Sequence, residues 1–314
     1  MALATLRSTG PEVGAFLACD WGTTNLRAWV LGESGSVQAH KEFPQLGVSR
    51  LQPGEAAKRF RDEIRPALGA EGLPALLCGM IGSTLGWTVV PYLDCPAELA
   101  SLAAALHEVD AAGPVRIVPG LRGPGVTEAS DVMRGEETQI FGWIRMDPQR
   151  RQGRHLVCHP GTHAKWALVE DGRIVRFVTA MTGELFDVLR KHSVLKTEDA
   201  AEDLDAFLEG VQAAGDGGAL SARLFSARGR VVADGKPQKS TSEYLSGLLV
   251  GADVAALPAL LGATVEGPVH LVGDVGLCRW YEKALSVRGV QSTICDGGLA
   301  VIAGLKALQR GERA

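Results

Sequence analysis

The sequence FLACDWGTTN, residues 16–25, decides the fold, because a second version of it, HLVCHPGTHA, occupies residues 155–164. In both stretches a short apolar run, typical of a buried strand, ends in a glycine-threonine turn. At one constant offset along the chain, Gly22 falls on Gly161. A repeat unit of this length is far longer than that of a solenoid protein, so the duplication predicts two related lobes.

Each copy continues as a three-strand meander. Residues 26–31 and 36–43 have the pattern of strands after the first turn, and residues 163–169 and 174–178 have it after the second. Further apolar runs and helical spacings then alternate, which predicts an α/β fold. They predict strands at residues 75–78, 115–118, 270–272 and 291–294, and helices at residues 53–68, 97–111, 132–144, 183–191, 241–257, 276–288 and 299–310.

A polar segment at residues 146–154 marks the boundary between the two copies. We therefore predict a flexible extension over residues 1–14, an N-terminal lobe over 15–150 and a C-terminal lobe over 151–314. We expect that the last helix can pack back on the first lobe. The charged region 196–240 receives no assigned role from its sequence.

Composition excludes several classes of protein. The 314 residues are 46% hydrophobic and 22% charged, with a net charge of −4 and no basic stripe, so nucleic acid is not an expected partner. We expect no membrane association, because no run of 18 apolar residues occurs. Six cysteines without a C-x-x-C pair indicate buried thiols in a reducing cytoplasm. The oligomeric state is left open, with a homodimer as one alternative.

The first turn suits a metal-bound polyphosphate. Asp20 ends a strand and can hold Mg²⁺ directly or through water. Gly22 lets the backbone approach phosphates, and the exposed N–H groups and side chains of the turn can donate to their oxygens. The candidate phosphate-binding residues are Gly22, Thr23, Thr24 and Asn25. A plain hairpin turn is the alternative, since these residue types favour turns anyway.

The second turn strengthens this interpretation, because two like turns facing each other would grip one polyphosphate from both sides. Its candidate phosphate-binding residues are Gly161, Thr162, His163 and Lys165. The second copy has His159 where the first copy has its aspartate, so only one lobe offers a carboxylate on the metal side.

Two adjacent acids, Glu136 and Glu137, lie at the start of a predicted helix just before the lobe boundary. A carboxylate there can reach a substrate hydroxyl and act as a general base. The two side chains point about 100° apart on a helix, so they cannot share one role. The alternative is that acidic residues simply favour the first helical turn.

Two further loops are candidate ligand sites. A polar-aromatic loop after the strand at 75–78 suits the face of a sugar, because open α/β sheets bind ligands at strand ends. Its candidate substrate-binding residues are Met80, Gly82, Ser83 and Trp87. Gly273 and Asp274, after another strand, could lie under an adenine ring, although many loops look this way.

Other familiar sites are absent. The spacing of His155, His159 and His163 imitates a helical metal site, but Pro160-Gly161 forbids the helix. The chain contains no G-x-x-x-x-G-K-[ST] phosphate loop, no G-x-G-x-x-G after a strand and no G-x-S-x-G elbow. These absences argue against P-loop enzymes, Rossmann dehydrogenases and serine hydrolases.

The motifs together resemble the 2-dehydro-3-deoxygalactonokinase family over residues 15–305. The resemblance rests on DWGTTNLRAW from residue 20, GMIGS from 79 with GW at 86 and PYL at 91, MRGEETQ from 133, PGTH from 160 with KW at 165, MTGEL from 181, and SGLL from 246 with GA at 251.

This resemblance implies the superfamily of actin, Hsp70 and the sugar kinases, with two RNase H-like lobes and ATP in an active-site cleft between them. It implies that residues 20–24 and 161–165 are the two phosphate loops and that Gly273-Asp274 is the adenosine loop. Gly135-Glu136, followed by Phe141-Gly142, is similar to the Gly-Asp stretch that supplies the base in glycerol and xylulose kinases. Glu137 stays open as an alternative base.

The implied reaction is ATP- and Mg²⁺-dependent phosphorylation of 2-dehydro-3-deoxy-D-galactonate, a small sugar acid, at its terminal hydroxyl to give the 6-phosphate and ADP, in galactonate catabolism. Arg134 is the preferred partner of the substrate carboxylate, and Arg27 is the second candidate. Arg27 in a structural role would instead pair with Glu136 or Glu137. The rival interpretations are a kinase for another hexose or sugar acid and a non-catalytic ATP-gated regulator.

Overall fold

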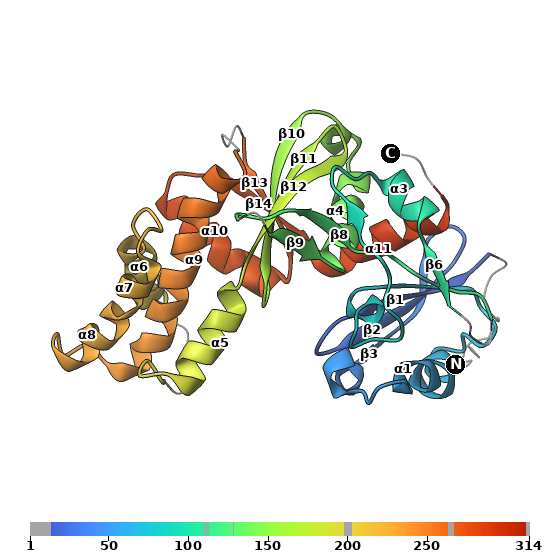
Figure 1. Ribbon diagram of the computed structural model, residues 1–314, viewed down its shortest axis with the longest axis horizontal. Coiled ribbons are helices and arrows are strands. Elements are labelled where there is room, and N and C mark those ends of the chain that lie inside the picture. The colour runs from blue at the N-terminus through green and yellow to red at the C-terminus, as the bar shows by residue number, and fades with distance from the viewer. Residues whose placement is uncertain are drawn as a thin grey trace, which may run out of the picture.

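The computed structural model describes residues 14–109, 111, 113–127, 129–197, 203–262 and 267–311 (Figure 1). Nearly all of the predicted N-terminal extension, residues 1–14, therefore lies outside the described residues.

The first sheet has the strand order β3-β2-β1-β4-β7-β6. The three-strand meander predicted at its start is confirmed: β1 pairs antiparallel with β2, and β2 with β3. Parallel pairing then joins β1 to β4 and β4 to β7. The strands are β1 (Phe16–Trp21), β2 (Leu26–Leu31), β3 (Val37–Phe43), β4 (Ala75–Cys78), β6 (His107–Val109) and β7 (Val115–Ile117).

The second sheet repeats this plan with the order β12-β11-β10-β13-β14. Its meander is antiparallel, and β10, β13 and β14 are parallel. The turn after β10 therefore stands where the turn after β1 stands in the first sheet. The strands are β10 (Arg154–His159), β11 (Ala164–Glu170), β12 (Arg173–Ala180), β13 (Val269–Gly273) and β14 (Ser292–Asp296).

Helices cover both sheets, and α4 and α11 lie between them (Figure 1). One hydrophobic cluster runs from Phe16 of the first sheet through Trp143 of α4 and Leu305 of α11 to Val157 of the second sheet. The helices are α1 (Glu55–Arg59), α2 (Arg65–Ala67), α3 (Leu99–Ala104), α4 (Glu136–Arg145), α5 (Thr182–His192), α6 (Leu204–Ala213), α7 (Leu220–Leu224), α8 (Ser226–Val232), α9 (Thr241–Leu260), α10 (Val275–Val287) and α11 (Gly297–Gln309).

A third, small sheet was not predicted. It contains β5 (Leu93–Asp94), β8 (Leu121–Pro124) and β9 (Ser130–Met133) in the order β5-β8-β9. The helix predicted at 97–111 ends early and gives way to β6, and the first residues of the helix predicted at 132–144 belong to β9. These residues form short strands that pair antiparallel with the adjacent strand of the chain, β6 with β7 and β9 with β8, and this pairing outweighs the local helical spacing.

The region 196–240 is mainly helical where it is described. It supplies α6, α7 and α8, and these pack with α9 around Tyr244 and Leu248. The segment Gln238–Leu260 is long and apolar enough to cross a membrane by composition, but 56% of its most apolar window is buried inside the protein, as in a core helix.

The crossing of α4 and α11 depends on two glycines. A Cβ at Gly142 would lie 1.8 Å from the carbonyl oxygen of Ala300, and a Cβ at Gly304 would lie 2.1 Å from that of Thr138. Real Cβ atoms do not approach backbone oxygens this closely, so any larger residue would push the helices apart.

We expect Gly142→Ala to lower the free energy of unfolding by at least about 1–3 kcal/mol, the usual cost of overpacking a core. Gly229→Ala in α8 is the matched control, since a Cβ there meets nothing within 4 Å. A helical glycine with free space should gain about 0.5–1 kcal/mol from alanine. Equal denaturant midpoints for the two variants would contradict the close helix contact.

Candidate active site

The ends of β1 and β4 meet the start of α4 at the carboxyl edge of the first sheet. Asp20 and Cys78 are parallel neighbours there. A Cβ at Gly79, whose φ is +90°, would lie 2.8 Å from the carbonyl oxygen of Trp21 and 3.4 Å from a carboxylate oxygen of Asp20. A Cβ at Gly135 would lie 3.1 Å from the Cα of Gly79. Three motifs far apart in the sequence thus converge on one point.

Asp20 forms an ion pair with Arg27. The Nη2 atom of Arg27 donates to the carboxylate at 2.5 Å, across the antiparallel β1–β2 pair. Burial by itself lowers the pKa of Arg27, but the charge and hydrogen bond of Asp20 outweigh it, so that pKa is raised above its ordinary value. The expected structural pairing of Arg27 with Glu136 or Glu137 is therefore wrong, because Arg27 pairs with Asp20.

The first turn presents its polar groups to solvent. The N–H of Gly22 donates to the carbonyl oxygen of Asn25 at 2.9 Å, which closes the turn. Thr23, Thr24 and Asn25 are exposed. Behind them, a Cβ at Gly47 would lie 2.2 Å from the backbone of Thr24, so close backbone packing supports the turn.

The two adjacent glutamates have different surroundings. Glu137 is fully buried and accepts hydrogen bonds from the N–H of Gly135 at 2.7 Å and the hydroxyl of Thr138 at 2.9 Å. Burial, reinforced by the charge of Glu136, raises the pKa of Glu137 to about 8. Glu136 is half-buried and accepts from the N–H of Arg134 at 2.9 Å. Glu136 is therefore the carboxylate with access to a ligand.

The second turn packs against the start of α5. Thr162 and His163 are exposed, and the ring of His163 contacts the carboxylate of Glu184. A Cβ at Gly183 would lie 2.6 Å from the carbonyl oxygen of Gly161, and the N–H of Glu184 donates to Thr162 at 3.0 Å. The segment 181–184, which carried part of the resemblance, was not included among the predicted site residues. Its Gly-Glu pair after a strand could have indicated it.

Lys165 does not point out of the second turn. Its side chain is buried, and its ammonium group donates to the carbonyl oxygen of Val132 at 3.0 Å and the hydroxyl of Thr179 at 2.8 Å. The predicted role as a phosphate ligand is corrected accordingly: on the antiparallel strand β11, the residue after Ala164 faces the neighbouring sheet.

His159, the counterpart of Asp20, faces α4. Its ring Nε2 lies 3.0 Å from the side-chain oxygen of Gln139. Burial lowers the pKa of His159, although the charges of Glu136 and Asp20 oppose the shift. The contact with Gln139 places His159 beside the first turn of α4.

Gly273 and Asp274 lie beside the second turn. A Cβ at Gly273 would lie 3.6 Å from the carbonyl oxygen of Pro160. The carboxylate of Asp274 accepts from the N–H of Leu277 at 2.9 Å and so begins α10. Asp274 therefore has a capping role in the fold.

The start of α11 was missed as part of this region. A Cβ at Gly297 would lie 2.5 Å from the side-chain oxygen of Gln139, and one at Gly298 would lie 3.6 Å from Arg27. Asp296 begins the helix by accepting from the N–H of Leu299. An aspartate before two glycines, after a predicted strand, is a helix-start signal that could have identified this segment.

The loop after β4 surrounds Arg134. The guanidinium lies 4.3 Å from the ring centre of Tyr92 and donates to the carbonyl oxygen of Val90 at 2.7 Å. A Cβ at Gly82 would lie 2.9 Å from its Nη1 atom. Arg134 is 8% exposed, and within the described part of the chain its buried Nε and Nη1 atoms have no hydrogen-bond partner. Two buried donors of Arg134 are thus left without a partner among the described residues.

Met80, Ser83 and Trp87, the other side chains of this loop that were predicted to bind substrate, are partly exposed. Met80 and Trp87 pack on the core of the first sheet, and the ring centre of Trp87 lies 5.5 Å from that of Phe60. The hydroxyl of Ser83 donates to the carbonyl oxygen of Met80 at 2.7 Å. These side chains shape the loop around Gly82.

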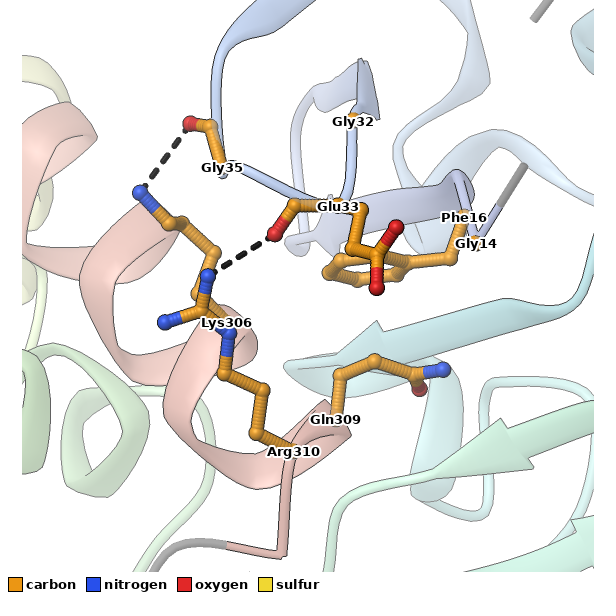
Figure 2. Close-up of a pocket in the computed structure, with 8 residues that line it drawn as sticks. All are labelled: Gly14, Phe16, Gly32, Glu33, Gly35, Lys306, Gln309 and Arg310. Atoms are coloured by element: carbon orange, nitrogen blue, oxygen red, sulfur yellow. Dashed lines mark hydrogen bonds between the residues drawn. The ribbon is translucent and has the colours of Figure 1, made fainter. Parts of the chain in front are cut away.

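A separate hollow lies at the opposite edge of the first sheet (Figure 2). Phe16, which lines it, begins β1, whereas Asp20 lies near the end of that strand. Figure 2 shows Lys306 and Arg310 donating to the carbonyl oxygens of Gly35 and Glu33. Ligands of open α/β sheets bind at the carboxyl ends of strands, so the candidate site is the edge at Asp20 and not this hollow.

The chain is similar to known proteins along nearly its whole length. The family model of 2-keto-3-deoxy-galactonokinase matches residues 20–308. A Rhizobium meliloti (strain 1021) protein assigned as a 2-dehydro-3-deoxygalactonokinase is 36% identical over 307 residues, which cover 95% of this chain and 97% of that protein. The 2-dehydro-3-deoxygalactonokinase of Escherichia coli (strain K12) is 33% identical over 295 residues, covering 93% and 97%.

The fold of the chain is also similar to that of solved structures. A crystal structure of a Sinorhizobium meliloti protein assigned to the same activity has a TM-score of 0.83 and 36% identity, covering 94% of this chain and 98% of that one. The activator of 2-hydroxyisocaproyl-CoA dehydratase from Clostridium difficile, solved with bound ADPNP, has a TM-score of 0.50 and 12% identity over 95% of both chains. The predicted actin-like fold class is confirmed. The chain belongs to the 2-keto-3-deoxy-galactonokinase family.

Proposed function

We propose that this protein transfers the terminal phosphoryl group of ATP to the 6-hydroxyl of 2-dehydro-3-deoxy-D-galactonate. The observation that carries the proposal is the buried guanidinium of Arg134, with two unpartnered donors, in the same segment as the accessible carboxylate of Glu136. A sugar acid needs both groups: a cation for its carboxylate and a base for its hydroxyl. Family membership supports the same substrate.

The nucleotide phosphates bind between the two turns. The exposed side chains of Thr23, Thr24, Thr162 and His163 offer donors on both sides. Helices α5, α10 and α11 begin at the same edge, and their N-termini favour negative charge. A protein with the same fold was solved with bound ADPNP, which supports ATP as the donor.

Arg27 occupies one carboxylate oxygen of Asp20, and the other oxygen would hold Mg²⁺ directly or through water. This cation usually takes one or two carboxylates together with substrate phosphates and water. The described residues contain no group of three or more potential ligands that would hold a metal alone, which agrees with a nucleotide-borne ion. When bound, Mg²⁺ neutralises charge on the phosphates.

Glu136 is the general base. Its half-buried carboxylate, fixed by the N–H of Arg134, accepts the proton of the 6-hydroxyl as that oxygen attacks. Glu137, with a pKa of about 8, carries a proton near neutral pH and holds the turn at Gly135. Their different environments thus give Glu136 and Glu137 different roles.

Arg134 binds the substrate carboxylate, because Arg27 is committed to Asp20. A guanidinium can pair with a carboxylate through two parallel hydrogen bonds.

The six cysteines are all unpaired, which supports a reducing cytoplasm as the compartment.

A coupled ADP-release assay tests the proposal: the galactonate-derived acid should be phosphorylated best, its C4 epimer less well, and galactose and glycerol barely. A neutral sugar that outperforms both acids would contradict the substrate, and turnover independent of any sugar would indicate a regulator.

We expect Glu136→Gln to lose about 10²–10⁴-fold in kcat with little change in KM, since a base acts in the transition state. Glu137→Gln is the matched control, because glutamine resembles the protonated acid and should keep most of kcat at pH 7. Steady-state kinetics of both variants decide the assignment. The reverse order of effects would make Glu137 the base.

We expect Glu137 to make stability depend on pH. Its folded-state pKa of about 8 lies above that of an unfolded glutamate, so the unfolded chain loses this proton first and stability falls as pH rises from about 4.5 to 8. The fall amounts to a few kcal/mol, at about 1.4 kcal/mol per pKa unit. In urea titrations, the stability of Glu137→Gln relative to wild type should therefore grow across this range. A difference independent of pH would show that Glu137 is ionised in the native protein.

We expect Arg134→Lys to raise KM for the sugar acid at least tenfold while KM for ATP changes little, because lysine cannot form the bidentate pair. Arg122→Lys is the control, since Arg122 is exposed and already pairs with Asp94. An unchanged KM for the acid would place the substrate carboxylate elsewhere.

A further inference from the structure

The buried ammonium group of Lys165 links segments that the proposed reaction uses separately. Lys165 follows the exposed His163 of the second turn by two residues, and its side chain is only 5% exposed. It donates to Val132 of β9 and to Thr179 of β12. One side chain therefore joins the nucleotide turn to two further strands.

Asp131 completes this network. Its two carboxylate oxygens accept from the backbone N–H and the hydroxyl of Thr179, each at 2.6 Å. A buried ammonium is costly unless its donors are satisfied, so the acceptors on Val132 and Thr179 hold Lys165 in this position. Because three of the four bonds join β9 to the second sheet, displacing β9 from that sheet would break these three together.

The network ends at the substrate side of the site. Val132 lies two residues before Arg134 and four before Glu136. A shift of the Val132 carbonyl would therefore move the proposed carboxylate clamp and the proposed base together. On the other side, Thr179 lies three residues before Thr182, which begins α5 against the second turn.

We propose that Lys165 is a positioning residue that couples the nucleotide turn to β9, the strand that leads directly into Arg134 and Glu136, so that ATP and the sugar acid favour each other's binding. The inference rests on the proposed function. A nucleotide that fixes the second turn also fixes Lys165, and through it the Val132 carbonyl. The sugar acid then meets an ordered site and loses less conformational entropy on binding. Such coupling is reciprocal and typically about 5- to 150-fold.

The test measures the Kd of the sugar acid by calorimetry, with and without saturating non-hydrolysable ATP analogue. In wild type, the analogue should lower this Kd at least about fivefold. In Lys165→Met, the ratio should fall close to one. Thr179→Val, which removes the side-chain acceptor of Lys165 without changing size, should reduce the ratio as well, and it decides the matter if Lys165→Met does not fold.

Two controls match these variants. Thr179→Ser keeps the hydroxyl and should keep the coupling. Lys306→Met removes another lysine that bridges segments through a carbonyl oxygen, that of Gly35, far from the site, and should also keep it. Cooperative thermal unfolding of each variant shows that it is folded.

The outcomes separate the inference from the function on which it rests. Folded variants at Lys165 and Thr179 with full coupling would overturn the inference. So would a Lys165→Met protein that loses only nucleotide affinity, because Lys165 would then be a direct phosphate ligand. Wild type that binds both ligands without coupling contradicts the inference alone. Wild type that does not bind the sugar acid contradicts the proposed function, and the inference with it.

Discussion

The contact between the backbones of α4 and α11 is the constraint on which the rest of the structure depends. Gly142 and Gly304 let the two helix backbones approach so closely that no side chain would fit at either position. Because α4 begins with Glu136, the proposed base, and α11 begins beside Gln139 and Arg27, this crossing fixes how the carboxyl edges of the two sheets face each other. Glycines at 79, 135 and 297 extend the same close packing into the site.

Within that frame, small differences in environment give similar residues different chemistry. Glu136 and Glu137 are adjacent, yet one is accessible and the other is buried with a raised pKa. Arg27 and Arg134 were both candidates for the substrate, yet one is paired with Asp20 and the other keeps two buried donors unpartnered. Burial and partners, not residue type, decide which group can meet a ligand.

The repeated strand-turn unit could be predicted because it is local: an apolar run and a glycine turn stand together in the sequence. The motif order around Asp20, Gly135 and Gly161 likewise identified the family. The partners of Arg27 and Lys165 could not be predicted, since Asp20 lies on the neighbouring strand and Val132 on a small sheet whose strands show no clear period. The start of α11 was missed because its role comes from packing against Gln139, a residue distant in the sequence.

The central claim is that one segment, from Arg134 to Glu136, binds the acid at one end and activates the hydroxyl at the other. A crystal structure of the protein with the ATP analogue and 2-dehydro-3-deoxy-D-galactonate tests it most directly. The account predicts the substrate carboxylate on Arg134 and the 6-hydroxyl within about 2.6–3.2 Å of a Glu136 oxygen, in line with the terminal phosphoryl group. A substrate whose carboxylate lies away from Arg134, or whose 6-hydroxyl faces another acid, would contradict it.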